Sequence, residues 1–439
     1  MNRNEEFTDF MKELDGNVPE ITESLKRGSR RKARKLFLYQ PVMGLVTVFA
    51  LFVLSVNLCA PVAEACSRIP VLKDLAKAVT FSKSLSTAVE NEYVQEMNLK
   101  QTQGDITAEI AYLIVDQKQV NVFYRFESDQ YEQLNAHCSL LDANGEELWG
   151  YSLSSGSYGL SNEELRCATA DFSEINVPDV LHFQMKVFEE SYEKGSEYIE
   201  EFDFLLEFDP TFTAKGKIYP VNQTMVLDGQ TITVKDIEVY PTHMRVNVED
   251  AKENTAWLRG LKFYIETGDG MQFTKPSVGI SATGAVDSKS MVSYYAESPY
   301  FYDAKQLRLV VTGAQWLDKG RERIRVDLET GESEELPENV TLKEVGEDAG
   351  GRLRLWFEES YIGGEAIGPA FGFQCYDATG EEYGFSIGTT TREEDLKDGE
   401  LGYVTVDYSL EDYPHKEIWL ETQYTRYWKA DKEIIVEIR

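Results

Sequence analysis

The histidines and cysteines, which would be needed for a zinc site, are few and widely spaced. The 439-residue chain has four histidines, His137, His182, His243 and His415, and no two of them form a short ligand motif. The segment Asp142-Ala-Asn-Gly-Glu146 is similar to the start of a calcium loop. It lacks the glycine at position six and the glutamate at position twelve that fold such a loop around the ion. We therefore expect a hairpin turn here, and neither a metal site nor a cofactor.

Residues for nucleophilic or acid–base catalysis form no recognisable motif. The chain has 76 acidic residues, but their spacing singles out no catalytic pair. A phosphate loop, a dinucleotide fingerprint and a nucleophile elbow are all missing from the sequence. We predict no catalytic residues and no enzymatic activity.

The cysteines leave two interpretations open. Cys138 and Cys167 lie 29 positions apart in the first expected β domain, whereas Cys375 has no partner in its own domain. In an oxidising compartment the first two can form a disulfide. The alternative, which we favour, is a pair of buried free thiols.

The overall charge excludes one class of partner. Acidic residues outnumber basic ones by 76 to 44, giving a formal net charge of -32. A nucleic-acid-binding protein needs a basic face to displace phosphate counterions. We therefore expect no direct binding to nucleic acid. A hydrophobic content of 42% is sufficient for folded cores.

A run of 28 uncharged residues, 36–63, predicts one membrane span. Its central 20 residues, 41–60, would form a helix about 30 Å long, which matches the hydrocarbon core of a bilayer. We place the transmembrane helix, in contact with lipid, at residues 36–62. Ala63-Glu-Ala65 has the pattern of a signal-peptide cleavage site, but the apolar run is too long for a signal peptide, and we favour an uncleaved anchor.

The flanking charges predict the orientation of this span. Seven basic and no acidic residues lie between Lys26 and Lys35. Because positive flanks remain in the cytoplasm, residues 1–35 should form a cytoplasmic tail and the C-terminal region should be extracellular. The tail carries nine basic and seven acidic residues, so the whole negative charge belongs to the part after it.

The tail contains one expected amphipathic helix. Phe7, Phe10, Met11 and Leu14 follow helical spacing and form an apolar stripe, with nothing in 35 residues to bury it. Acidic neighbours disfavour an anionic membrane surface. We expect the stripe to bind a cytoplasmic protein partner through residues 1–24.

Beyond the span, a juxtamembrane helical segment at 63–99 precedes an all-β region. Apolar residues at helical spacing predict two short helices, at 69–79 and 82–90. They could pack on the first β domain, which we favour, or lie against the membrane surface. From Ile106 onward apolar and polar residues alternate, as in Val120–Phe126, which is typical of half-buried strands.

Two sequence units recur in the β region. The hairpin at Cys138–Leu148 is repeated at 374–383, with a looser copy at 264–273. A second unit at 307–328 recurs at 418–438. We expect three immunoglobulin-like β-sandwiches outside a single transmembrane helix, at residues 100–209, 210–329 and 330–439.

Some segments also resemble a known family. Ile69-Pro-Val-Leu-Lys-Asp-Leu75 and the segment 81–94, placed after a basic cluster and one span, resemble the Gram-positive membrane family known by its domain of unknown function 4179. The resemblance is clearest over residues 36–128. The segment Gly229–Val239 looks like the immunoglobulin-like domain that often follows. This family is regarded as anti-sigma-like, and the resemblance implies a tail that holds a sigma factor of the extracytoplasmic-function type at the cell membrane.

These observations lead to two functional hypotheses. The first is a single-pass membrane regulator of the anti-sigma type that couples an unidentified envelope ligand to a cytoplasmic sigma factor. The alternative is a cell-surface binding or adhesion module without a cytoplasmic signalling role, because tandem β domains suit both. Deletion of residues 1–24 should abolish the output of a regulator and leave an adhesin working.

Overall fold

The computed structural model describes most of the chain after residue 69. The described residues are 70–156, 160–172, 175–189, 197–276, 280–284, 289–302, 304–347, 351–362, 369–391 and 400–439. The predicted tail at 1–35 and the predicted span at 36–62 lie outside them. No helix within the described ranges is long and apolar enough to cross a membrane. The chain divides into two compact units, Met1–Lys73 and Asp74–Arg439, and the architecture below is that of the second.

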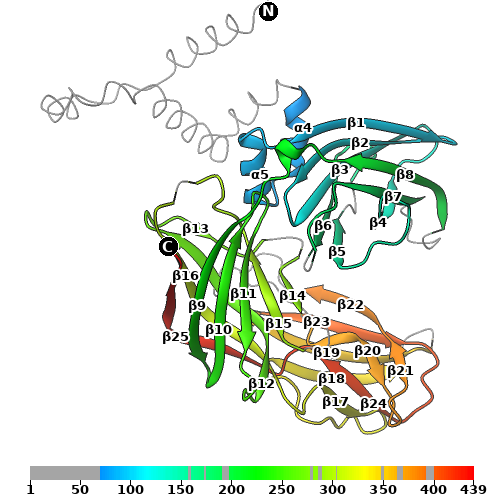
Figure 1. The fold of residues 1–439 in the computed structure, drawn as a ribbon. Coiled ribbons are helices and arrows are strands. Elements are labelled where there is room, and N and C mark those ends of the chain that lie inside the picture. The colour runs from blue at the N-terminus through cyan, green and yellow to red at the C-terminus, as the bar shows by residue number, and fades with distance from the viewer. Residues whose placement is uncertain are drawn as a thin grey trace, which may run out of the picture. The chain divides into compact units, whose positions relative to one another are not determined.

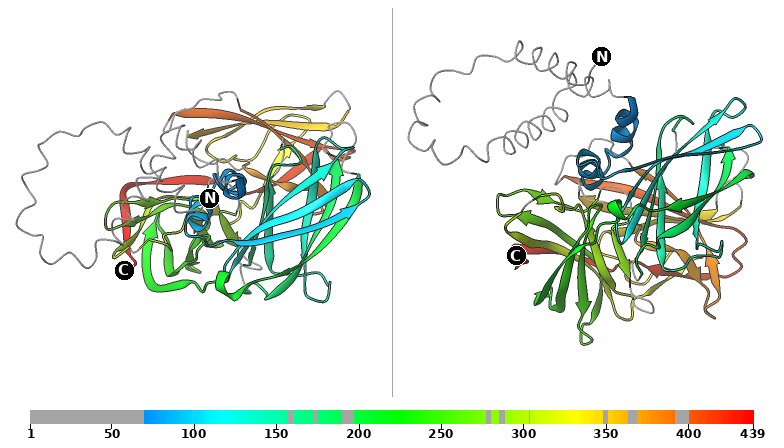
Figure 2. Two further views of the ribbon diagram at one scale, coloured as in Figure 1. Left: turned by 90° about the horizontal axis from the view of Figure 1, so that it is seen from above. Right: turned by 45° about the horizontal axis from the view of Figure 1, so that its top comes forward.

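The expected pair of helices is present and packs on the first sandwich, as predicted. Helix α4 spans Pro70–Ala78 and α5 spans Lys83–Glu90, with Ser82 as the N-cap of α5. Leu75 and Leu85 are buried in a cluster that includes Phe123 from the facing sheet. Figure 2 shows both helices beside the first strands of this sheet. Apart from these helices and one 3-10 turn, η2 (Pro210–Phe212), the described chain is all-β.

The first sandwich consists of two antiparallel sheets (Figure 1). The larger sheet has the order β1 (Gln95–Gln103), β2 (Ile106–Val115), β3 (Gln119–Ser128), β6 (Arg166–Phe172) and β5 (Tyr151–Gly156). The smaller has the order β4 (Leu134–Leu141), β7 (Val180–Glu189) and β8 (Tyr198–Glu207). Strand β2 is buried along nearly its whole length, because the core covers one face of its sheet and the helices cover the other.

The second sandwich also has two antiparallel sheets. One has the order β14 (Ala282–Gly284), β15 (Met291–Ala296), β11 (Met244–Asp250), β10 (Gln230–Val239) and β9 (Lys217–Leu227). The other has the order β13 (Gln272–Phe273), β12 (Ala256–Thr267), β16 (Leu307–Asp318) and β25 (Arg426–Glu437). Its core includes Trp316 and, from the C-terminal strand, Val436.

The third sandwich lies in sequence between two strands of the second. One sheet has the order β17 (Arg323–Asp327), β24 (Glu417–Thr422), β20 (Phe371–Tyr376) and β21 (Glu382–Gly384). The other has the order β18 (Val340–Glu347), β19 (Leu353–Ile362), β23 (Leu401–Leu410) and β22 (Ser386–Thr391). Phe357, Phe371 and Tyr408 meet at its centre.

These pairings divide the chain differently from the ranges 210–329 and 330–439 that the repeats suggested. Strand β17 pairs with β24 in the third sandwich, and β25 pairs with β16 in the second (Figure 1). Val436 on β25 is fully buried in the core of the second sandwich. The alternation of apolar and polar residues identifies which face of a strand is buried. It does not identify the neighbouring strand with which that strand forms hydrogen bonds.

The recurring hairpins share one hydrogen-bond pattern. The Asp142 carboxylate accepts the amides of Asn144 and Glu146 at 2.8 and 2.9 Å, and Asp377 accepts those of Thr379 and Glu381 at the same two distances. In the looser copy the hydroxyl of a threonine, residue 267, takes the place of this carboxylate and accepts the amide of residue 271 at 3.0 Å. The element that recurs is thus the hydrogen-bonded turn of the hairpin. The Asp142 segment forms the hairpin that we expected.

Candidate functional site

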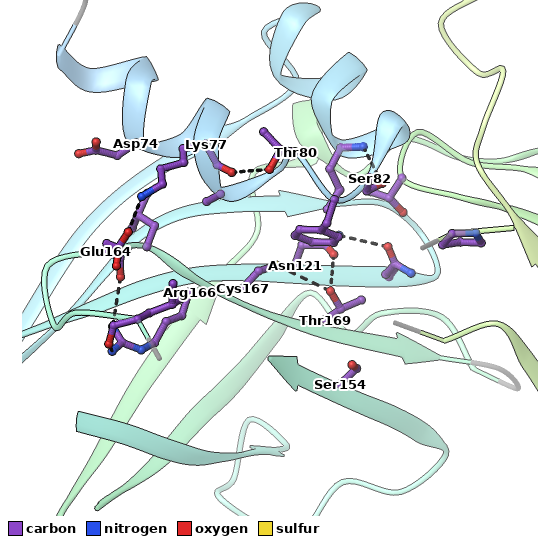
Figure 3. A pocket seen from close by; sticks show the side chains of 18 of the residues that line it. Asp74, Lys77, Thr80, Ser82, Asn121, Ser154, Glu164, Arg166, Cys167 and Thr169 are labelled. Atoms are coloured by element: carbon purple, nitrogen blue, oxygen red, sulfur yellow. Dashed lines mark hydrogen bonds and ion pairs between the residues drawn. The ribbon is translucent and has the colours of Figure 1, made fainter. Parts of the chain in front are cut away.

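A cavity with a volume of about 550 Å³ lies at the junction of the first two sandwiches (Figure 3). Its walls come from the start of α5, from the outward-facing side chains of β3 and β6, and from residues before β11 and on β15. The outer face of the first sheet carries polar groups here because the helices do not cover it completely. We take this cavity and the buried groups behind it as the candidate site.

Amide and hydroxyl groups line the wall contributed by β3 and β6. Asn121 is fully buried and its side-chain amide donates to the carbonyl of Ile114 at 3.1 Å and to Oε1 of Gln119 at 3.2 Å. Thr169 donates from its hydroxyl to Oδ1 of Asn121 at 2.8 Å. Figure 3 shows Asn121 and Thr169 beside each other on neighbouring strands. These groups are held in place before any ligand arrives.

A buried ion pair connects the two sandwiches behind the cavity. Nη2 of Arg245 on β11 donates to both carboxylate oxygens of Asp171 on β6, at 2.9 Å each, and to the carbonyl of Phe172 at 3.1 Å. The hydroxyl of Tyr295 on β15 donates to the same carboxylate at 2.7 Å. All four residues are buried, so the interaction is shielded from salt and water.

A directional chain of hydrogen bonds continues from this pair. Nε of Arg245 donates to Nε2 of His243 at 3.0 Å, which places the ring proton on Nδ1 in the neutral imidazole. Nδ1 then donates to the hydroxyl of Thr242 at 2.8 Å, and that hydroxyl donates to Oδ2 of Asp116 at 2.6 Å. Burial lowers the pKa of His243 well below its ordinary value, which agrees with the neutral ring.

Burial at the junction makes the ionised forms of Asp116 and Asp171 less stable. Burial raises the pKa of Asp116 to about 6, although four hydrogen bonds from Lys118, Gln119 and Thr242 oppose the shift. Burial also raises the pKa of Asp171 above its ordinary value, against the opposing effect of Arg245. Each carboxylate therefore depends on donors from the other sandwich for part of its stability as an anion.

Helix α5 is tied to the second sandwich by Glu297. The hydroxyl of Ser82 and the amide of Ser84 donate to Oε2 of Glu297 at 3.1 and 2.6 Å, and the hydroxyl of Ser84 donates to the same atom. Ser82 also caps the helix by accepting the amide of Leu85 at 3.3 Å. One serine thus begins the helix and anchors it to the neighbouring domain.

The outer rim of the cavity carries charges of both signs. Lys77 and Glu164 form an ion pair, which Figure 3 shows, and the hydrogen bond from Lys77 is the main reason that the pKa of Glu164 falls to about 2. Arg125 pairs with Glu109 at 2.7 Å. Arg166 also lines the cavity but is buried rather than part of the rim, and its guanidinium donates to backbone carbonyls, among them that of Leu134 at 2.9 Å.

The candidate residues singled out in the sequence have different outcomes. The stripe of Phe7, Phe10, Met11 and Leu14 falls outside the described residues. Cys138 and Cys167 are free thiols, as in the alternative that we favoured, but both are half-buried rather than buried. Each lies beside a hydroxyl, of a tyrosine and a threonine respectively, at 3.7 Å.

The histidines do not come together. His182 pairs with Asp203 at 2.8 Å, His415 lies 3.3 Å from Asp377, and His243 belongs to the junction. Within the described ranges, no three side chains of the kinds that bind metals are grouped.

Asp116, Asp171 and Arg245 were not identified as candidate site residues from the sequence. Each interrupts an apolar pattern at or near a strand end: Asp116 follows the apolar strand β2, and Arg245 stands between Met244 and Val246. A charged residue within an apolar strand indicates that a group of opposite charge or a hydrogen-bond partner is buried next to it. The sequence does not show which residue that partner is.

The comparison with known families decides the identity of the first part of the chain. Residues 33–128 match the family described as a domain of unknown function, DUF4179. The chain carries a DUF4179 domain. The resemblance seen in the sequence is thereby confirmed, and the match runs from the basic cluster through the uncharged run, α4 and α5 to the end of β3. Asp116 and Asn121 of the junction belong to this DUF4179 domain.

Further domains follow the DUF4179 domain. Residues 216–343 match a second family of unknown function, DUF5643, which supplies Thr242, His243 and Arg245. None of the curated proteins compared with the chain matches it. A solved structure, the crystal structure of the conserved domain protein from Bacillus anthracis, is 15% identical. The alignment covers 55% of this chain and 85% of that one, with a TM-score of 0.40.

Proposed function

We propose that this protein is a single-pass membrane regulator of the anti-sigma type, with its N-terminus in the cytoplasm and three immunoglobulin-like sandwiches outside the cell. The observation that carries the proposal is the DUF4179 match over residues 33–128, because it joins the uncharged run directly to the helices and the first sheet. The family is regarded as anti-sigma-like, and the charges around the run favour this orientation.

The contacts around α5 support a way to transmit a signal. α5 packs through Leu85 on the first sandwich and is bound through Ser82 and Ser84 to Glu297 of the second. A change in the packing of the two sandwiches would therefore act on the helices that connect them to the preceding chain. In this proposal the junction is the two-state element that an envelope signal biases.

The cytoplasmic end would hold the partner. The stripe of Phe7, Phe10, Met11 and Leu14 offers four apolar side chains, and burying a large one completely contributes about 1.5–3 kcal/mol. Binding at the membrane would keep a sigma factor away from RNA polymerase and raise its concentration near the tail. No enzymatic step is required.

The test is capture of the partner in cells. The full-length protein should co-purify with a sigma factor, and the double variant Phe7→Asp, Phe10→Asp should lose it and derepress the sigma-dependent genes. The matched control is Asn2→Asp, Thr8→Asp, which adds the same two charges away from the stripe and should retain the partner. Equal retention by both variants, or no sigma factor with the unaltered chain, would overturn the proposal.

The second candidate is a surface-binding module without signalling. The observation that favours it is the cavity at the junction, which a binding protein could use without any cytoplasmic partner. Deletion of residues 1–24 separates the two candidates, because the transcriptional output of a regulator should disappear while binding at the surface should persist.

A further inference from the structure

We propose that the cavity between the first and second sandwiches binds a small, uncharged, polyhydroxylated molecule of the size of a mono- or disaccharide. The proposal does not depend on the cytoplasmic tail. The volume of about 550 Å³ is within the range of roughly 300–1,000 Å³ that small-molecule sites occupy. The cavity lies between domains, where such sites are common.

The polar lining of the cavity matches hydroxyl groups. Thr169 and Ser154 present hydroxyl groups from neighbouring strands, and the buried Asn121 behind them accepts the hydroxyl of Thr169. A hydroxyl both donates and accepts, so it can bind a ligand hydroxyl in either sense. Because Asn121 is fixed by Ile114, Gln119 and Thr169, this wall loses little conformational freedom when it binds.

The charges around the cavity favour a neutral ligand. Arg245 is already paired with Asp171, and His243 is neutral with both ring nitrogens engaged. Glu297 is held by the neutral donors of Ser82 and Ser84, so its carboxylate would repel an anion. The rim carries both signs, so a net charge on the ligand gains little there.

The remaining wall is more apolar. Tyr295 lines it, whereas the His243 ring is stacked between the rings of Tyr240 and Tyr295, at 5.1 and 5.5 Å, so both of its faces are covered. Phe81, Leu85 and Ile280 add further apolar surface. A pyranose has polar edges and an apolar C–H face, and a hydroxyl-bearing wall opposite a more apolar wall matches both.

The test uses the full-length chain in a detergent without a sugar headgroup. Isothermal titration with glucose, N-acetylglucosamine and maltose should show one-to-one binding of at least one of them, with a Kd below about 10 mM. Glucose 6-phosphate, as an anion, and glucosamine, as a cation, should bind at least about tenfold more weakly than the best neutral sugar. Failure of all three neutral sugars to bind, or equal binding of a charged one, would overturn the proposal.

Variants locate the binding. Thr169→Val removes one cavity hydroxyl while keeping a β-branched side chain in the strand, and it should weaken binding about tenfold. Ser154→Trp fills the cavity from the half-exposed strand β5 and should abolish binding. The matched control, Thr224→Val on β9 of the second sandwich, should change nothing. If Ser154→Trp melts at the wild-type temperature and still binds the sugar, the ligand occupies another place.

Discussion

Arg245 and Asp171 come from different sandwiches and meet in a buried ion pair in which one guanidinium nitrogen contacts both carboxylate oxygens at 2.9 Å. They are separated by 74 residues. Burial alone would lower the pKa of Arg245, but Asp171 raises it, so the arginine stays charged. The pair is a buried polar contact between the DUF4179-containing sandwich and its neighbour, and the first expected outcome depends on it.

Replacing Arg245 by methionine should destabilise the junction. The Asp171 carboxylate would remain buried without its cation, which costs about 3–5 kcal/mol. The free energy of unfolding, measured by urea denaturation at pH 7, should fall by that amount. Arg325→Met removes the partly exposed pair with Glu417 and should cost less than about 1 kcal/mol. If both variants lost the same free energy of unfolding, the buried junction pair would contribute no more to stability than an exposed ion pair.

Asp116 should make the stability of the protein depend on pH. Its pKa is about 6 in the folded state and 3.8 ordinarily, so the folded state holds this proton more tightly than the unfolded state. The resulting stabilisation is full below pH 3.8 and is lost as pH rises through 6. Between those limits the wild type should lose up to about 3 kcal/mol relative to Asp116→Asn. Urea midpoints of both proteins at pH 4, 5, 6 and 7 measure this, and parallel curves would contradict it.

Glu359 should make the stability of the third sandwich depend on pH as well. Oε1 accepts the amide of Ala370 at 3.1 Å, Oε2 has no hydrogen-bond partner among the described residues, and burial raises the pKa to about 7. The folded state therefore binds the Glu359 proton more tightly than the unfolded state. The resulting contribution to the free energy of unfolding is complete below pH 4.5 and is lost as pH rises through 7. Glu359→Gln should therefore be more stable than wild type at pH 8, by about 2–3 kcal/mol, with a smaller difference at pH 5.

Hydrogen exchange of the amides in β19 and β24 monitors unfolding of the third sandwich during this measurement. Glu411→Gln, at an exposed position just after β23, is the control and should behave as wild type at both pH values. A Glu359→Gln variant less stable than wild type at pH 8 would show that the buried carboxylate has a compensating partner.

The placement of β25 predicts which domain a C-terminal substitution weakens. Val436→Ala removes buried volume from the core of the second sandwich and should cost about 2 kcal/mol there. Hydrogen exchange should then accelerate in β12 and β16 and stay unchanged in β19 and β23. Val406→Ala, in the core of the third sandwich, should give the opposite pattern. Acceleration confined to the third sandwich in Val436→Ala would refute the observed pairing.

The three described thiols should react slowly in the folded protein. Burial raises the pKa of Cys138, Cys167 and Cys375 to about 12, so very little thiolate is present at pH 8. Alkylation by iodoacetamide, followed by peptide mass spectrometry, should label these cysteines much faster in urea than in native buffer. Fast labelling in native buffer would mean that the sandwich opens around them.

Local features of the structure were predictable from the sequence because their causes lie within a few residues. Leu75 and Leu85 follow helical spacing, and both helices formed where that spacing predicted them. The hairpins at Asp142 and Asp377 recur because each aspartate accepts amides only two and four residues ahead. The alternation of apolar and polar residues was sufficient to predict an all-β chain.

Only the tertiary structure decided the pairing of β25 with β16 and the contact between Asp171 and Arg245. Both join residues that are distant in sequence, and each partner alone is compatible with many others. Val436 would fit any apolar sheet face, and Arg245 would fit any buried carboxylate. Their actual partners depend on which strand edges and surfaces the folded domains bring together, and the cavity exists only because two such surfaces meet incompletely.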